Sequence, residues 1–177
     1  MPRNVEIKAK VSDLISLTTK AKVLSGDDGI YMKQEDTFFN AAHGRLKLRS
    51  VQGEKAKLIQ YSRPDQSGPK LSDFLITLVE DADGLKKVLA SAMGIKGEVK
   101  KTRHLIMHDQ TRIHIDDVQG LGHFMELEVQ LREDQTIGDG EKIAKDIMDK
   151  LGIDKGDLID GAYMDLLLDN NSPGKRF

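Results

Sequence analysis

The 177-residue sequence contains no cysteine and no tryptophan, and aromatic residues make up only 5% of it. Without cysteine the chain cannot form a disulfide, supply a thiolate nucleophile or build a cysteine-ligated zinc site. It also has no apolar run long enough to cross a membrane, and its N-terminus does not match a secretory signal peptide. We therefore expect a cytoplasmic protein with no membrane association.

A strong charge of one sign is also missing. The formal net charge is −2, because 27 lysine and arginine residues are offset by 29 aspartate and glutamate residues. This balance gives no global basic field that would attract nucleic acid, so we expect no nucleic-acid partner, and it leaves room for a local basic site. The length fits one domain. We assign it to residues 1–169 and expect the polar, Pro- and Gly-containing segment 170–177 to be a flexible tail.

The opening stretch NVEIKAKV, residues 4–11, alternates apolar with polar or charged side chains, which is typical of a strand with one apolar face. Similar patterns predict further strands at residues 30–39, 44–51, 54–63, 72–79, 98–109, 111–118 and 123–131. Helix-spaced apolar residues and capping signals predict helices at residues 12–24, with Ser12 as a possible cap, and at 81–94, 139–153 and 157–169. Successive strands joined by short turns favour an antiparallel sheet or barrel.

The charged faces of these strands are sorted by sign. The segments 44–51 and 54–63, expected to be hairpin neighbours, carry mainly bases on one face, whereas 123–131 carries Glu126 and Glu128. Like charges about 4 Å apart repel by on the order of 4 kcal/mol at an effective dielectric near 20, and by about 1 kcal/mol in water. An exposed basic cluster is therefore tolerable, and ordinary solvated sheet faces remain one interpretation. An enclosed cluster would need an anion.

A polyphosphate bound with a divalent ion matches this separation of bases and carboxylates onto different strands. Arginine grips phosphate oxygens in bidentate fashion, and hard divalent ions take carboxylate oxygens. Glu126 and Glu128 project from the same face of one strand, and Glu6 can join them if the first and last strands are neighbours, as in a closed barrel. His114 is two residues after Arg112 in the same predicted strand, so it lies on the same face as Arg112 and is a further candidate for this site.

Six segments together resemble the CYTH domain, or triphosphate tunnel metalloenzyme, family. They occur in the family's order over nearly the whole chain: NVEIK (4–8), QEDTFF (34–39), GRLKLR (44–49), YSRPD (61–65), TRIHIDDVQGLGHFMELEV (111–129) and GAYMDLL (161–167). The family includes class IV adenylyl cyclases, thiamine triphosphatases and inorganic triphosphatases. The resemblance implies an α+β fold, an eight-stranded antiparallel closed β-barrel with flanking helices, whose inward-pointing charges form a triphosphate tunnel.

The resemblance also implies site residues. Glu6, Glu126 and Glu128 correspond to metal-binding carboxylates for Mg²⁺ or Mn²⁺, and Asp116 is a further candidate for the metal site. Lys57 is the candidate for assisting the attacking water. The implied phosphate-binding set is Lys8, Lys10, Arg45, Lys47, Arg49, Lys57, Arg63, Lys101, Arg103 and Arg112.

Two positions depart from the family pattern. Asn4 stands where the motif E-x-E-x-K has its first glutamate, and Phe38 stands where some hydrolytic relatives have a tyrosine. The leading hypothesis is metal-dependent hydrolysis of a small-molecule triphosphate, either inorganic or organic. Adenylyl cyclisation of ATP and non-catalytic polyphosphate binding remain alternatives. The scarcity of aromatic rings favours inorganic triphosphate over thiamine triphosphate.

Overall fold

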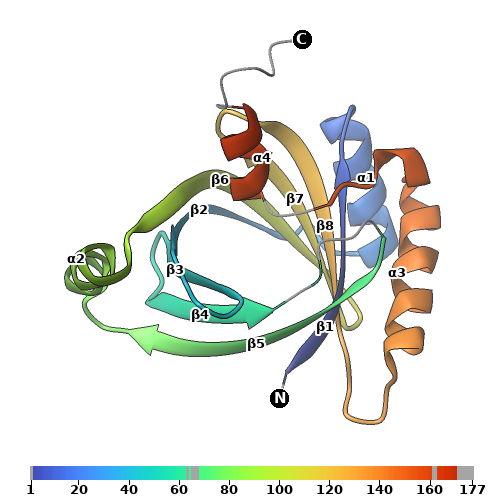
Figure 1. Cartoon of the computed structure of the whole chain (residues 1–177). Helices are drawn as coiled ribbons and strands as arrows, with labels where there is room; N and C mark the ends of the chain where they lie inside the picture. Colours follow the sequence, from blue (N-terminus) through green and yellow to red (C-terminus); the bar gives the residue numbers. More distant parts are fainter. Residues whose placement is uncertain (1, 63, 65–67, 161–162, 171–177) are drawn as a thin grey trace.

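A computed structural model describes residues 2–62, 64, 68–160 and 163–170 of the chain. These residues form a closed antiparallel barrel of eight strands in the order β1-β5-β4-β3-β2-β6-β7-β8, with helices around it (Figure 1). This confirms the α+β barrel predicted from the sequence. The expected tail, residues 170–177, lies outside the described residues apart from Asn170.

The strands follow the alternating segments of the sequence. They are β1 Arg3–Lys10, β2 Ile30–Phe39, β3 Arg45–Val51, β4 Ala56–Ser62, β5 Lys70–Val79, β6 Ile95–His108, β7 Thr111–Val118 and β8 Gly122–Gln130. The helices are α1 Leu14–Ser25, α2 Ala82–Met93, α3 Ile137–Leu151 and α4 Tyr163–Asn170, with a short 3-10 helix at Lys155–Asp157. None of the described helices is both long and apolar enough to span a membrane.

Several element boundaries differ from the prediction. The side chain of Asp13, rather than that of Ser12, caps α1 by accepting a hydrogen bond from the backbone of Ser16. β5 and β6 begin earlier than predicted, at Lys70 and Ile95. The predicted helix 157–169 is interrupted, and its described helical part begins at Tyr163.

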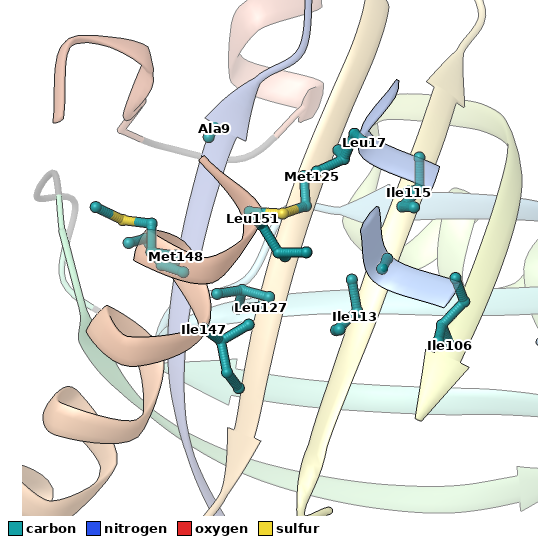
Figure 2. Close-up of a cluster of buried hydrophobic side chains, with 12 residues drawn as sticks. Ala9, Leu17, Ile106, Ile113, Ile115, Met125, Leu127, Ile147, Met148 and Leu151 are labelled. Carbon is teal, nitrogen blue, oxygen red and sulfur yellow. The ribbon is translucent and has the colours of Figure 1, made fainter. Parts of the chain in front are cut away.

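The main hydrophobic core lies outside the barrel, between its wall and two helices. The outward-facing apolar residues of β1, β6, β7 and β8 pack against α1 and α3 (Figure 2). The buried members include Ile113, Met125 and Leu127 on the wall and Leu17 and Ile147 on the helices. Each fully buried aliphatic side chain stabilises the fold by about 1.5–3 kcal/mol. This outer packing frees the opposite face of each strand, inside the barrel, to carry charge.

One end of the barrel is closed by a second apolar cluster. Phe38, Tyr61, Phe124 and Tyr163 are buried there together, and the partly buried Leu166 of α4 packs on them. Figure 1 shows α4 lying over this end, where β7 finishes and β8 begins. The barrel interior is therefore more accessible from the opposite end.

Candidate active site

The barrel encloses a cavity of about 300 Å³ whose lining is mostly polar and charged. Its charged lining comprises seven bases and five carboxylates from the inner faces of the strands and one loop: Lys8, Lys47, Arg49, Lys57, Lys101, Arg103 and Arg112, and Glu6, Asp36, Glu54, Glu126 and Glu128. The charged faces seen in the sequence therefore point inward. Bases outnumber acids, so the lining favours an anion.

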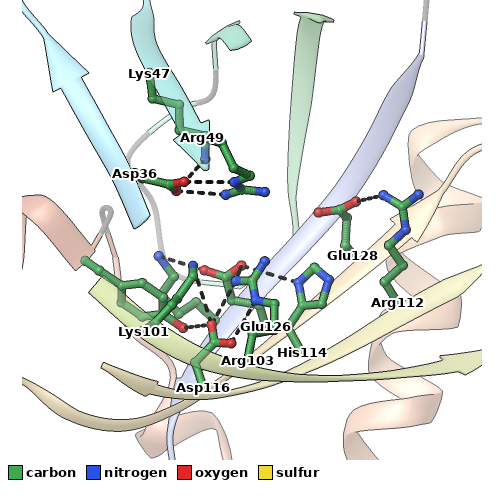
Figure 3. Close-up of polar contacts among 12 residues, drawn as sticks. Asp36, Lys47, Arg49, Lys101, Arg103, Arg112, His114, Asp116, Glu126 and Glu128 are labelled. Atoms are coloured by element: carbon green, nitrogen blue, oxygen red, sulfur yellow. Dashed lines mark hydrogen bonds and ion pairs between the residues drawn. The ribbon is translucent and has the colours of Figure 1, made fainter. Parts of the chain in front are cut away.

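The first group of charges surrounds Asp36 on β2. Nε and Nη2 of Arg49 donate to the two carboxylate oxygens of Asp36 at 2.8 Å each, and Lys47 Nζ lies 3.4 Å from Oδ2 (Figure 3). Burial raises the pKa of Asp36, but the charges of Arg49 and Lys47 outweigh it and hold this pKa well below its usual range. Burial and then the neighbouring Arg49 charge lower the pKa of Lys47 to about 7. Lys47 is thus a lysine that titrates near neutrality.

The second group surrounds Asp116 on β7. Arg103 donates from Nε and Nη2 to the two oxygens of Asp116 at 2.8 Å each, and the hydroxyl of Tyr163 donates to Oδ2 at 2.9 Å. Lys101 Nζ lies 3.7 Å from the same oxygen. Burial opposes ionisation of Asp116, yet Arg103 and Lys101 lower its pKa to about 2. Burial and the Arg103 charge lower the pKa of Lys101 to about 8.

Glu126 on β8 joins this second group. Lys8 Nζ lies 3.2 Å from Oε1 of Glu126, Arg103 Nη2 donates to Oε2 at 3.3 Å, and His114 Nδ1 is 3.8 Å from Oε2. Burial raises the pKa of Glu126, but the charge of Lys8, the nearby His114 ring and the charge of Arg103 hold it well below its usual range. Burial and Arg103 also lower the pKa of His114, so its imidazole is biased toward the neutral form.

The strand register brings the predicted metal-binding carboxylates to adjacent positions. Glu6 on β1 is directly opposite Glu128 on β8, and Lys8 is directly opposite Glu126. These three glutamates supply the oxygen donors that Mg²⁺ and Mn²⁺ prefer, so their chemistry and backbone placement fit such an ion. The side chains of two of them contact bases: Glu126 contacts Lys8 and Arg103, and Glu128 accepts from Arg112 at 3.1 Å. In the described part of the chain, no three His, Asp or Glu side chains are already gathered as a ligand set.

Most of the predicted phosphate-binding bases reach the cavity. Seven of the ten line it. Lys10 is exposed at the end of β1 and does not line the cavity. Arg45 lies near the closed end, where Nη2 donates to Asp165 of α4 at 2.7 Å. Arg63 lies outside the described residues.

Lys57, the predicted water-assisting residue, lies near the accessible end. Its side chain is 38% exposed, and its Nζ is 3.8 Å from Glu54. Lys47 rather than Lys57 accompanies the aromatic residues, because its Nζ is 4.9 Å from the ring centre of Tyr61 and 5.6 Å from that of Phe38. Asn4 is buried and lines the cavity.

Sequence reasoning missed Asp36 and Gln34, which both line the cavity. Asp36 is the centre of the first charged group, and Gln34 lies beside that group. A signal was present, because Gln34, Asp36 and Phe38 are every second residue of QEDTFF and therefore lie on the same face of the strand. A further residue of the site is Tyr163, which is buried in the apolar cluster and also lines the cavity. Nothing in the local sequence pairs it with Asp116, which is 47 residues away.

The family profile for the CYTH domain matches residues 2–163, nearly the whole chain. The chain belongs to the CYTH domain family. Enzymes of this family are triphosphatase-like or adenylyl cyclase-like and generally depend on a divalent metal ion. A CYTH cavity that carries both bases and carboxylates is consistent with that chemistry.

The relatives of this CYTH chain include candidate cyclases. The adenylate cyclase candidate MJ0240 of Methanocaldococcus jannaschii is 27% identical over 92% of this chain and 97% of its own. Among solved structures, PH1012 of Pyrococcus horikoshii has a TM-score of 0.82 at 22% identity, covering 93% of this chain and 99% of its own. The adenylyl cyclase candidate HpAC1 of Hippeastrum, described as having a dominant triphosphatase activity, has a TM-score of 0.66 at 12% identity, with 98% of each chain covered. These structural similarities show the fold alone.

Proposed function

We propose that this protein is a divalent-metal-dependent hydrolase of a small-molecule triphosphate. The observation that carries the proposal is the convergence of seven bases on one barrel cavity, with carboxylates on the same inner wall. A triphosphate brings several negative charges into a small volume, and few other small ligands would balance so many cations. The family's triphosphatase-like and cyclase-like members support the same substrate class.

The bases stabilise the negative charge on the phosphate oxygens, which is the main demand that phosphoryl transfer makes on a protein. In hydrolysis, a water oxygen forms a bond to the terminal phosphorus while the bond to the leaving diphosphate oxygen breaks, and negative charge spreads over the phosphate oxygens. Arg49 and Arg103 present planar guanidinium groups that bind those oxygens, and Lys47 and Lys101 add charge at short range. Glu6, Glu126 and Glu128 would hold Mg²⁺ or Mn²⁺, which neutralises phosphate charge and orients water when bound.

Buried carboxylates prepare this set of bases before substrate binds. Asp36 fixes Arg49 through two hydrogen bonds, and Asp116 fixes Arg103 in the same way. A guanidinium held in place loses less side-chain freedom when a phosphate arrives. Lys57, which lies nearer the accessible end, is the candidate for assisting the attacking water.

The test measures phosphate release from tripolyphosphate and from ATP with Mg²⁺ and with Mn²⁺. We expect metal-dependent release, and we expect Arg49→Gln to reduce kcat/KM by at least tenfold because it removes a bidentate contact. Lys145→Gln on the outer helix α3 is the matched control, since Lys145 is exposed outside the barrel, and it should behave as the wild type. Folded protein that releases no phosphate from any triphosphate contradicts the proposal.

Adenylyl cyclisation is the second candidate, because the relative MJ0240 is named as an adenylate cyclase candidate. In that reaction the ribose 3′-hydroxyl attacks the α-phosphorus and diphosphate leaves. Assaying cyclic AMP beside ADP and orthophosphate from the same ATP reaction separates the two activities. Tight binding of triphosphate without any product would instead indicate a binding protein, consistent with Asn4 and Phe38 replacing the family's glutamate and tyrosine.

A further inference from the structure

A buried histidine lies among the predicted metal ligands. The side chain of His114 on β7 is only 6% exposed, and it lines the cavity. In the strand register His114 is directly opposite Glu126 on β8, and the next cavity-facing position of β8 carries Glu128. Figure 3 shows the His114 ring beside Glu126, on the side toward Glu128. The fold therefore places an imidazole next to two carboxylates that fit a divalent ion.

One ring atom of His114 has no partner in the described part of the chain. Its Nδ1 is buried and makes no hydrogen bond there. The distance from Nδ1 to Oε2 of Glu126 is 3.8 Å, which is too long for a hydrogen bond. A buried polar atom without a partner costs about 1–3 kcal/mol, so a ligand that engages Nδ1 would remove this cost.

The spacing between the two side chains fits a shared metal ion. A first-row divalent ion lies about 2.1 Å from an imidazole nitrogen or a carboxylate oxygen, so two donors to one ion are at most about 4.2 Å apart. The 3.8 Å between Nδ1 of His114 and Oε2 of Glu126 is within this limit. Oε2 also accepts from Arg103 at 3.3 Å. Because a carboxylate oxygen has two lone pairs, this hydrogen bond leaves one of them for an ion.

Asp116, the further metal candidate from the sequence, is less well placed. Arg103 donates to both of its oxygens, and Tyr163 donates to Oδ2. The register partner of Asp116 on β8 is Phe124, whereas that of His114 is a glutamate. Of these two residues of β7, His114 is therefore the one that can join the glutamates around an ion.

The donor set then contains nitrogen as well as oxygen. We infer that His114 binds the metal ion through Nδ1, together with Glu126 and Glu128, and makes the site prefer a first-row transition ion, Mn²⁺ among them, to Mg²⁺. Mg²⁺ takes oxygen ligands and loses its water reluctantly, whereas imidazole is a common ligand of transition ions. The inference rests on the proposed function only for the presence of a divalent ion at these glutamates. It decides between the two ions that the sequence left open.

Pulsed electron paramagnetic resonance tests the nitrogen ligand directly. The sample is the whole chain with Mn²⁺ and methylenediphosphonate, an anion that contains no nitrogen and is not hydrolysed. We expect a magnetic coupling between Mn²⁺ and a nitrogen nucleus in the wild type, and its loss in His114→Gln. His123→Gln is the matched control, because His123 is exposed on the outer face of β8, and it should keep the coupling. Labelling the wild type with ¹⁵N-histidine repeats the test without a variant, since the coupling should then change to that of ¹⁵N.

Calorimetric titration with each ion measures the preference. The wild type should bind Mn²⁺ at least tenfold more tightly than Mg²⁺. His114→Gln should weaken Mn²⁺ binding about tenfold and leave Mg²⁺ binding within about twofold, because Mg²⁺ gains little from nitrogen. The thermal denaturation midpoint verifies that the variant is folded.

The outcomes separate this inference from the proposed hydrolysis. A wild type that binds Mn²⁺ without a nitrogen coupling, or equal weakening of both ions by His114→Gln, overturns the inference even if triphosphate is hydrolysed with Mg²⁺. Loss of the coupling with selective loss of Mn²⁺ affinity supports it even if no triphosphate is turned over. Absence of binding by either ion overturns both the inference and the metal dependence of the proposed reaction.

Discussion

At the scale of single residues, the cavity combines fixed and titrating charges. Arg49 and Arg103 stay charged throughout, whereas Lys47 and Lys101 have pKa values lowered to about 7 and about 8. Alternation along the strand found Lys47 and Arg49, and the family resemblance added Lys101 and Arg103. Parity does not report depth along the barrel, so it did not distinguish these residues from Lys10, which has the same inward parity and is exposed at a strand end.

The titration of Lys47 predicts that triphosphate binding is linked to proton uptake. At about pH 8 most free protein carries neutral Lys47, and a bound polyanion favours the ammonium form and raises its pKa. Binding at about pH 8 should therefore take up protons, and affinity should fall as pH rises above 7. At about pH 6 Lys47 is charged in both states and its uptake should vanish. Calorimetry in buffers of different ionisation enthalpy measures this, and Lys47→Arg should remove the Lys47 share. Proton release at pH 8 would contradict the assignment.

Asp116 should matter for stability as well as for the site. It is fully buried, and its negative charge is the partner of Arg103 and Lys101. Asp116→Asn leaves these cations without that charge, so we expect the free energy of unfolding to fall by about 3–5 kcal/mol. Asp117→Asn is the matched control, because Asp117 is the next residue on β7 and faces solvent, and it should cost less than about 0.5 kcal/mol. Urea denaturation compares the two, and equal losses would show that Asp116 is not a structural counter-charge.

At the scale of secondary-structure elements, alternation predicted all eight strands because each has one face toward the cavity and one toward the outside, where β1, β6, β7 and β8 pack against the outer core. The boundaries were less predictable. Apolar residues of β5 before residue 72 and of β6 before residue 98 are few, so the pattern began too late. The last helix was predicted too early, because Asp157 and Leu158 mimic a helix start although they close a 3-10 turn.

Helix α4 illustrates a contact that no local pattern shows. Tyr163 attaches it to the barrel through the aromatic cluster and the hydrogen bond to Asp116, and Asp165 pairs with Arg45. Tyr163 is 4% exposed, so Tyr163→Ala should lower the free energy of unfolding by about 3–5 kcal/mol. Tyr31→Ala, at a tyrosine that is 68% exposed, should cost less than about 1 kcal/mol. If urea denaturation gives similar losses for both variants, α4 does not close the barrel in solution.

At the scale of the whole molecule, the hydrophobic core is outside the barrel and the charges are inside. The sequence indicated this arrangement through sorted charges on neighbouring strands, and the family resemblance gave its closure. The difference between the closed and the accessible end of the cavity was not readable in advance. It depends on the shear of the barrel, which places Ile30, Leu105 and Ile76 at one end although they lie far apart in the chain.

This arrangement predicts that the folded protein is stabilised by the anion it binds. Converging cations repel one another, and a bound triphosphate relieves that repulsion only in the folded state. Tripolyphosphate with Mg²⁺ at about one hundred times its dissociation constant should add about 2.7 kcal/mol and raise the thermal midpoint by about 5–10 °C. Sulfate at equal ionic strength is the control. It should raise the midpoint much less, because one sulfate cannot contact the bases around Asp36 and those around Asp116 at the same time. The shift should shrink with added salt, which screens the partly exposed Arg112 and Lys57. An equal shift with sulfate would mean that the cavity responds to ionic strength alone and does not select a phosphate chain.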